Sequence, residues 1–288
     1  MSTQSSARTE NDQGTILDVA LAEQVLEHLG FSQLPSPTLE NLHTVYKAWS
    51  RGVGYDNVQK RVYFAEGGTG PFPLADPNDF MRAFLKHGTG GSCWVVAEAY
   101  FGLLYHIGYD VRRVAGQMLN CDDPMKPNHG TVLVTFDGVD YATDPSMVGE
   151  EAIPLLTGEP SAAASKAHGL WSTGNGNYWW RPGHSRVAIE YTTQFDPCSY
   201  RYFIERYEKT KEFSLFNTVL YVRRNHDGGI RTVGRGNLIH IDLEGNMTGE
   251  PIAEPALSEL LVEQMGLSEE IVSRLPPDDG GATFGNVS

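Results

Sequence analysis

Cys93 is the residue whose neighbours best suit it to act as a nucleophile. It ends the run Gly90-Gly91-Ser92-Cys93, and a largely apolar helical stretch follows it. Ser92 is a favourable helix N-cap, so Cys93 falls in the first helical turn. Free backbone N–H groups and the helix dipole favour a thiolate there, and the same N–H groups can stabilise an oxyanion. The alternative is a cysteine buried in a core, which the Gly-Gly-Ser-Cys turn makes the less favoured interpretation.

Asp137-Gly138 predicts a two-residue hairpin that brings His129 close to Asp144. The residues on both sides of the dipeptide are mainly β-branched or aromatic, and Asp-Gly in that setting is a strong hairpin signal. In the resulting register His129 faces Ser146. Side chains two residues apart on a strand share a face, so His129 and Asp144 become diagonal neighbours, about 7–8 Å apart between Cα atoms. The sequence therefore predicts a carboxylate that orients an imidazole.

Cys93, His129 and Asp144 together make a candidate catalytic triad for acyl transfer through a cysteine. Such a triad needs a carboxylate to fix the imidazole tautomer and to support its cationic form. Taken singly, a histidine is more often a surface or hydrogen-bonded residue, and an aspartate before proline is more often a turn residue. The hairpin register favours the catalytic interpretation of the pair, and it leaves open whether Cys93 meets the pair.

Composition narrows the classes of function. The chain has 288 residues, 40% hydrophobic, and a formal net charge of −14. We see no basic stripe of the kind that nucleic-acid binders use and no apolar run near the roughly 20 residues that span a bilayer. The three cysteines are scattered, which favours reduced thiols in the cytoplasm over disulfides or a metal site. We expect no nucleic-acid partner, no membrane partner and no metal.

The elements that must position the triad change from helices to strands after Gly108. Apolar spacing and stop residues predict helices over 17–29, 36–52, 76–88 and 92–107. Strand signals follow at 111–119, 131–136, 139–143, 186–192, 215–224 and 230–241, with a long loop over 150–176. Two short helices are expected at 256–265 and 268–274. This order predicts an α+β fold with three sub-domains, between a disordered leader (1–14) and a disordered tail (277–288).

These residues resemble those of the arylamine N-acetyltransferases, and also the amide synthases that close ansamycin-type macrolactams. The family carries an Arg-Gly-Gly-x-Cys motif, matched here by Thr89–Cys93, then a histidine, matched by His129. An aspartate follows fifteen residues later, matched by Asp144. Further similar stretches are 37–49, 100–111, 213–238 and 256–265, so the resemblance covers nearly the whole ordered chain.

The resemblance implies a fold and a reaction. The fold would be a helical bundle (15–110) carrying Cys93, an antiparallel β-barrel (111–205) carrying His129 and Asp144, and an α/β lid (206–276), with a Cys-His-Asp core like that of cysteine proteases and transglutaminases. The reaction would be a ping-pong transfer, in which acyl-CoA acylates Cys93 and an amine, hydrazine or hydroxylamine then takes the acyl group.

The family pattern changes around the triad. Thr89 replaces the family's Arg, and Val95 and Ala97 replace its Glu and Asn. All three are small or apolar, which suggests a compensated replacement and a different acyl donor, acceptor or both. The loop 144–148 and the segment 53–57 are also altered. The candidates for substrate contact are Trp94, Val95, Asn128, Met147 and Phe203, although aromatic residues at such spacings more often belong to the core.

Three other functions remain open. An amide synthase would take its acyl chain from a carrier protein in place of acyl-CoA. A thiol hydrolase or transglutaminase-like enzyme would share the same triad. A non-catalytic scaffold is the third, and the presence of all three triad residues disfavours it.

Overall fold

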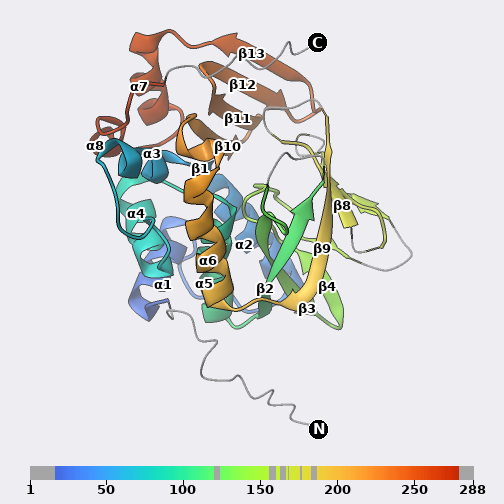
Figure 1. The fold of residues 1–288 in the computed structure, drawn as a ribbon. Helices are drawn as coiled ribbons and strands as arrows, with labels where there is room; N and C mark the ends of the chain where they lie inside the picture. The colour runs from blue at the N-terminus through green and yellow to red at the C-terminus, as the bar shows by residue number, and fades with distance from the viewer. Residues whose placement is uncertain are drawn as a thin grey trace.

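The computed structural model describes residues 17–119, 124–155, 160–162, 167, 169–175, 177–182 and 187–278. The leader expected at 1–14 lies outside this range. The chain has an α+β fold: helices gather on one side, an antiparallel sheet curls beside them, and a second antiparallel sheet with its own helices lies across one end (Figure 1). Both sheets contribute residues that surround the predicted triad.

The first part of the chain is helical, as predicted. Its helices are α1 (Val19–His28), α2 (Leu39–Gly52), α3 (Val58–Ala65), α4 (Pro77–His87) and α5 (Cys93–Ile107). The sequence did not predict α3. The helix expected from residue 36 begins at Leu39, and its N-cap is Thr38, whose side chain accepts from the Asn41 N–H. Gly88 and Gly108 end α4 and α5 in the left-handed conformation, which glycine adopts without steric cost.

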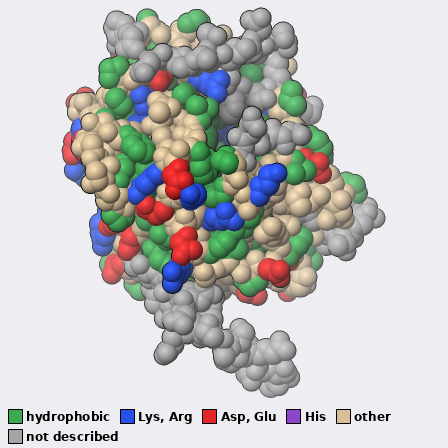
Figure 2. Space-filling view, in the orientation of Figure 1, with side chains coloured by type: hydrophobic (Ala, Val, Ile, Leu, Met, Phe, Trp, Pro, Cys, Tyr) green, Lys and Arg blue, Asp and Glu red, His purple; other side chains and the backbone are tan. Residues whose placement is uncertain are grey.

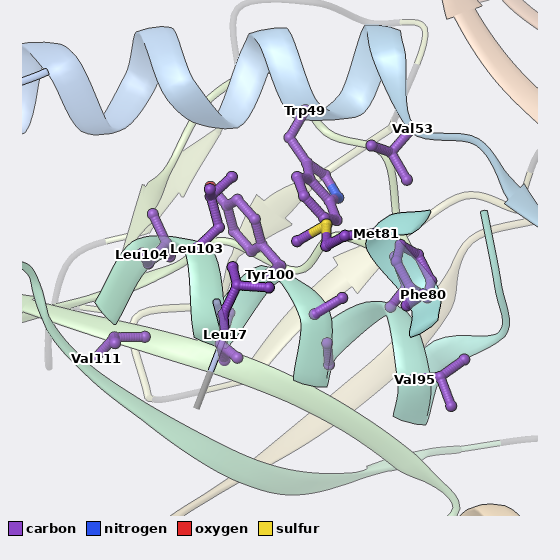
Figure 3. Close-up of a cluster of buried hydrophobic side chains, with 14 of the residues drawn as sticks. Leu17, Trp49, Val53, Phe80, Met81, Val95, Tyr100, Leu103, Leu104 and Val111 are labelled. Carbon is purple, nitrogen blue, oxygen red and sulfur yellow. The ribbon is translucent and has the colours of Figure 1, made fainter. Parts of the chain in front are cut away.

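The main hydrophobic core lies between these helices and two strands of the curled sheet. Trp49 stacks on Phe80 at 6.2 Å and contacts Tyr100 at 4.9 Å between ring centroids. Figure 3 shows Trp49 and Val53 reaching down from α2 toward the side chains of α4 and α5. Because α5 is packed on nearly all sides, its first residue, Cys93, is held on a rigid support.

An antiparallel sheet of eight strands follows, in the spatial order β5-β4-β3-β2-β9-β8-β7-β6. The strands are β2 (Asp110–Met118), β3 (His129–Phe136), β4 (Val139–Ala142), β5 (Ile153–Pro154), β6 (Ser161–Ala162), β7 (Trp171–Ser172), β8 (Asn177–Trp180) and β9 (Ile189–Pro197). The edge strand β5 contacts β6 and β7, so the sheet curls into a nearly closed barrel. A separate apolar cluster, which includes Val114, Leu133, Met147 and Tyr191, belongs to this sheet.

The predicted hairpin register is confirmed. Phe136 pairs with Val139 and Val134 with Tyr141, and both loop residues have positive φ, 49° at Asp137 and 77° at Gly138. The strand expected at 186–192 begins later, at Ile189, and Arg186 lies outside the described residues. The loop expected at 150–176 contains the short strands β5, β6 and β7, which extend the curled sheet to its far edge.

The second sheet has five strands in the order β1-β10-β11-β12-β13. They are β1 (Tyr55–Asp56), β10 (Tyr221–His226), β11 (Gly229–Gly234), β12 (Asn237–Asp242) and β13 (Met247–Pro251). The single strand expected at 230–241 is wrong: Arg235 and Gly236 turn the chain with φ of 50° and 71°. The strand expected from Leu215 is also wrong there, because 215–217 form a 3-10 helix.

The remaining helices cover the ends of these sheets. They are α6 (Tyr200–Lys209), which the sequence did not predict, α7 (Glu254–Glu263) and α8 (Glu269–Val272), with a 3-10 turn at Thr210–Glu212. Pro277 and Asp278, expected in a disordered tail, are packed against the fold. The Asp278 carboxylate pairs with Arg61 at 3.1 Å and both side chains are buried, because a buried guanidinium needs a partner of opposite charge. Residues 279–288 lie outside the described range.

Candidate active site

Cys93 begins α5, half-buried, at the end of a turn that only glycine can make. A Cβ at Gly90 would lie 1.7 Å from the Gly54 carbonyl oxygen, so a larger residue would push the turn away from β1. Ser92 occupies the N-cap position, but its side chain does not cap the helix, and its hydroxyl has no partner among the described residues. The first-turn N–H groups therefore have no side-chain cap and face the neighbourhood of the thiol with their positive ends.

Two charged residues hold this turn, and sequence reasoning did not assign either one. The Asp56 carboxylate accepts from the Gly90 N–H at 2.5 Å and from the Val58 N–H at 3.1 Å. Arg224, on β10, donates to the carbonyls of Gly52 and Gly88 and interacts electrostatically with Asp56. Burial raises the pKa of Asp56 to about 6, although the two N–H groups and Arg224 act in the opposite direction.

Where the family has Arg, Glu and Asn, this chain has one side-chain hydrogen bond and two apolar core residues. Thr89 is fully buried, and its hydroxyl accepts from Gln59 at 3.3 Å. Val95 and Ala97 belong to the main core. Because Arg224 and Asp56 supply charges to the same turn from other strands, the altered residues do not leave the turn without support.

His129 and Asp144 form the close pair that the hairpin predicts. The His129 Nε2 lies 2.7 Å from the Asp144 Oδ2, and both side chains are almost fully buried. Cys93 is near enough to His129 to help raise the pKa of the imidazole. Since Nε2 is engaged by Asp144, Nδ1 is the ring nitrogen that remains for the thiol. The structure thus brings Cys93, His129 and Asp144 together at one site.

Ser146 joins this chain, which sequence reasoning did not anticipate. Its hydroxyl lies 3.2 Å from the His129 Nε2 and 2.5 Å from the Asp144 Oδ1. The backbone N–H of Ser146 donates to the same carboxylate oxygen at 3.0 Å. The signal was present in the hairpin register, which places Ser146 opposite His129.

The pair has a defined charge state. Burial alone would lower the pKa of His129, but the charge and hydrogen bond of Asp144, together with Cys93, raise it to about 10. For Asp144, burial acts to raise the pKa, and the charge and hydrogen bond of His129 and the bond from Ser146 outweigh it, so the net shift is downward. At neutral pH the site therefore holds an imidazolium beside a carboxylate.

The loop that carries Asp144 is anchored from two other elements. The Tyr46 hydroxyl, on α2, donates to the Asp144 carbonyl at 2.6 Å, and the Ser50 hydroxyl donates to the Gly149 carbonyl. From β10, the Asn225 side chain donates to the Val148 carbonyl. Val148 has a φ of 47°, a conformation that a β-branched residue adopts only under constraint. Helix α2 and strand β10 therefore together hold the backbone of the loop that carries the Asp144 carboxylate.

The five candidates for substrate contact occupy different places. Trp94 and Phe203 pack edge to face at 5.1 Å and are buried, and Val95 is buried beside Gly91. Asn128 uses its side chain on the backbone of Met118. Met147 lies in the apolar cluster of the curled sheet. Trp94 is adjacent in sequence to Cys93, and Asn128 to His129, whereas the other three are buried in the apolar clusters.

Cys93 should react with iodoacetamide at neutral pH at least about tenfold faster than Cys198, because a thiolate is the nucleophile. Cys93 lies near a cationic imidazole, whereas burial raises the pKa of Cys198. Timed alkylation followed by peptide mass mapping measures both rates. Cys121 lies outside the described residues and serves as a third reference thiol. Equal slow labelling of Cys93 and Cys198 would contradict an activated thiol.

Within the described ranges, no group of three or more His, Cys, Asp or Glu side chains is placed to share one metal ion. No helix in the described part of the chain is long and apolar enough to cross a membrane.

Comparison with known proteins agrees with this geometry. A family model described as N-acetyltransferase matches residues 38–272. The arylamine N-acetyltransferase of Mycobacterium marinum in complex with CoA is similar in fold, with a TM-score of 0.72, 16% identity, and coverage of 88% of this chain and 98% of that one. The Bacillus cereus arylamine N-acetyltransferase with a Cys-His-Glu catalytic triad has a TM-score of 0.65 at 16% identity, over 86% and 98% of the two chains.

One curated relative is similar to part of the chain. Proansamycin X synthase of Amycolatopsis mediterranei (strain S699) is 24% identical over 147 residues, which are 50% of this chain. The aligned region spans only 55% of that relative. The family match, in contrast, extends over most of the chain and includes Cys93, His129 and Asp144. The protein therefore belongs to the N-acetyltransferase family and has the fold of the arylamine N-acetyltransferases.

Proposed function

We propose that the protein is an N-acyltransferase that carries an acyl group from acyl-CoA to a small-molecule amine, hydrazine or hydroxylamine through a thioester on Cys93. The observation that carries the proposal is the half-buried Cys93 thiol at a helix N-terminus, near the hydrogen-bonded pair of His129 and Asp144. A reduced catalytic thiol and an acyl-CoA donor both fit a cytoplasmic protein. The complex of the M. marinum protein with CoA supports the choice of donor.

In the first half-reaction the Cys93 sulfur attacks the thioester carbonyl of the donor. His129 holds the proton that the thiol has lost, and the first-turn N–H groups of α5 are placed to stabilise the negative oxygen of the tetrahedral intermediate. When the bond from carbon to the CoA sulfur breaks, His129 returns the proton to that sulfur. The products are free CoA and the Cys93 thioester.

In the second half-reaction the acceptor nitrogen attacks the Cys93 thioester. His129 takes the proton from the nitrogen as the new C–N bond forms, and the Cys93 sulfur leaves as a thiolate beside the imidazolium. Asp144 stabilises that imidazolium through its bond to Nε2. Attack by nitrogen in preference to water would require the acceptor to displace water near Cys93.

A panel of acyl-CoA thioesters, read by intact-protein mass, tests the proposal. We expect the protein to gain the mass of one acyl group with at least one donor, and to lose that group when an amine acceptor such as an arylamine or a hydrazine is added. Cys93→Ala should gain no mass, whereas Cys198→Ala, a matched change at a half-buried thiol, should be acylated normally. Absence of acylation by every acyl-CoA in the panel would refute the proposal.

A second candidate is an amide synthase that takes its acyl chain from a carrier protein. The similarity to proansamycin X synthase favours it. The two candidates differ in the donor, since both use the Cys93 thioester. Acylation of Cys93 by an acyl carrier protein carrying a phosphopantetheine thioester, with none from the free acyl-CoA of the same chain, would replace the first candidate by the second.

A further inference from the structure

Arg223, on β10, is a buried cation without a partner. Its side chain is 0% exposed, and its Nε, Nη1 and Nη2 have no hydrogen-bond partner in the described part of the chain. Nor does any described carboxylate form an ion pair with it. A buried guanidinium left unpaired is strongly unfavourable, because it has lost its hydration without gaining a partner. A group from outside the protein is therefore the expected partner.

Several exposed cations in the described part of the chain form ordinary ion pairs. On the face shown in Figure 2, positive and negative side chains lie side by side in the region of α6. Arg201 pairs there with Glu205 at 2.7 Å, and Lys209 with Glu212 at 2.5 Å. Arg223 differs from these surface cations, because its lack of an ion pair is particular to its buried site.

Arg223 lies between the turn that precedes Cys93 and the loop that follows Asp144. It pairs with Tyr55 across β10 and β1, and Tyr55 forms a β-bridge with Gly91, two residues before Cys93. Adjacent strands are about 4.8 Å apart, so the Arg223 backbone is roughly 10 Å from that of Gly91. On the other side, Asn225 shares the face of Arg223 and holds the Val148 carbonyl in the loop after Asp144.

The surroundings of Arg223 are positive and aromatic. The guanidinium lies over the Trp180 ring at 5.3 Å from its centroid. Arg181 adds a second positive charge nearby, and the hydroxyls of Tyr46 and Tyr55 are close enough to interact with Arg223 electrostatically. A planar guanidinium fixed on an aromatic face offers two parallel N–H groups, which match the two oxygens of a carboxylate.

The position of Arg223 near Cys93 indicates which part of the substrate would carry the negative charge. The phosphates of CoA lie at the far end of a long pantetheine arm, whereas the acyl group and the acceptor nitrogen meet at Cys93. We propose that Arg223 binds a substrate carboxylate, carried either by the transferred acyl group, as in a dicarboxylic acyl-CoA, or by the amine acceptor. The inference rests on the proposed acyl transfer through Cys93 and adds the substrate class to it.

Two kinetic arms separate the sources of the carboxylate. In the first, the acylation rates of Cys93 by succinyl-CoA and butyryl-CoA are compared by intact mass. In the second, the rates at which 4-aminobenzoate and 4-aminobenzamide discharge the acetyl-enzyme are compared. We expect at least about tenfold preference for the carboxylate in one arm, and loss of that preference in Arg223→Met. The arm that responds identifies the source, and no preference in either arm overturns the proposal.

A stability measurement distinguishes binding from a structural role. Arg223→Met is expected to melt at the same or a higher temperature than the wild type, because an apolar residue replaces an unpaired buried charge. Succinate at millimolar concentration is the probe, and it should raise the melting temperature of the wild type but not of Arg223→Met. Arg201→Met makes the same change at a side chain that is 86% exposed, and it should respond to succinate as the wild type does.

The outcomes separate this proposal from the acyl transfer on which it rests. Acetylation of Cys93 without carboxylate preference in either arm, together with a lower melting temperature of Arg223→Met, overturns the carboxylate site and leaves acyl transfer intact. If no thioester acylates Cys93, acyl transfer fails, and the succinate measurement alone decides. A succinate shift that Arg223→Met abolishes then supports the site, and equal shifts in the two proteins overturn it.

Discussion

Replacing His129 with glutamine is expected to lower the rate of Cys93 acylation by about 10²–10⁴-fold, the usual contribution of a positioned acid–base group. The glutamine amide can still donate to Asp144, so the loss of the proton acceptor is separated from the loss of the hydrogen bond that His129 makes at 2.7 Å. The rate is measured in a single turnover, as the appearance of acyl-enzyme mass over time at several donor concentrations.

The control for this change is His28→Gln. His28 lies in the last turn of α1 and is exposed, so the same substitution there should leave the acylation rate within about twofold of the wild type. Acylation of His129→Gln at the wild-type rate would show that Cys93 loses its proton by another route. That result would remove His129 from the mechanism without removing Cys93.

The parts of the site that local chemistry determines could be predicted from the sequence. Asp137-Gly138 specifies a turn with two positive φ angles, the turn specifies the register, and the register places Asp144 beside His129. Likewise, the Gly-Gly-Ser-Cys run predicts Cys93 at the start of a helix, although the Ser92 side chain does not form the expected cap. Each of these inferences depends on residues within about fifteen positions of one another.

The support of the site could not be predicted, because it comes from residues far away in the chain. The Tyr46 hydroxyl reaches the Asp144 carbonyl across 98 positions, and Arg224 reaches the Gly88 carbonyl across 136. Arg223 and Arg224 are adjacent in sequence and point to opposite faces of β10. Periodicity alone gives no reason to expect that one holds the Cys93 turn and the other remains unpaired.

The replacement of the family's Arg by Thr89 also depends on residues that are distant in the sequence. In the sequence, Thr89 marks only the loss of a cation before Gly-Gly. In the structure, the Asp56 carboxylate and the Arg224 guanidinium meet at that turn from β1 and β10. A charge that is lost at one position can thus be supplied from a strand that pairs there, and only the sheet order reveals the donor.

Asp144→Asn is expected to change how the stability of the protein depends on pH. In the wild type the native pKa of His129 is about 10, above the ordinary value near 6.5 that applies when the chain is unfolded. The native state therefore keeps a proton that the unfolded state releases. This contribution to the free energy of unfolding is fully present below pH 6.5 and is lost as pH rises toward 10. Its size over that window is a few kcal/mol.

The substitution removes the charge that keeps His129 protonated. Burial lowers the pKa of His129, and Asp144 is the main opposing influence, so in Asp144→Asn the imidazole should be neutral across the window. Urea unfolding at pH 6.5 and pH 9.5 measures the effect. The wild type should lose more stability between these values than the variant does. Burial lowers the pKa of Lys60 to about 8, which acts in the opposite direction but equally in both proteins, and so it cancels in the comparison.

Asp140→Asn is the matched control, because Asp140 lies on the same hairpin and pairs with Arg112 at 2.6 Å without contacting His129. Its pH dependence between 6.5 and 9.5 should follow that of the wild type. The acylation rate should fall by about 10²–10⁴-fold in Asp144→Asn, since the imidazolium formed during the reaction loses its support. Equal pH dependence in the wild type and Asp144→Asn would mean that His129 is neutral in the resting protein, and Cys93 would then have to lose its proton to His129 only as the acyl donor arrives.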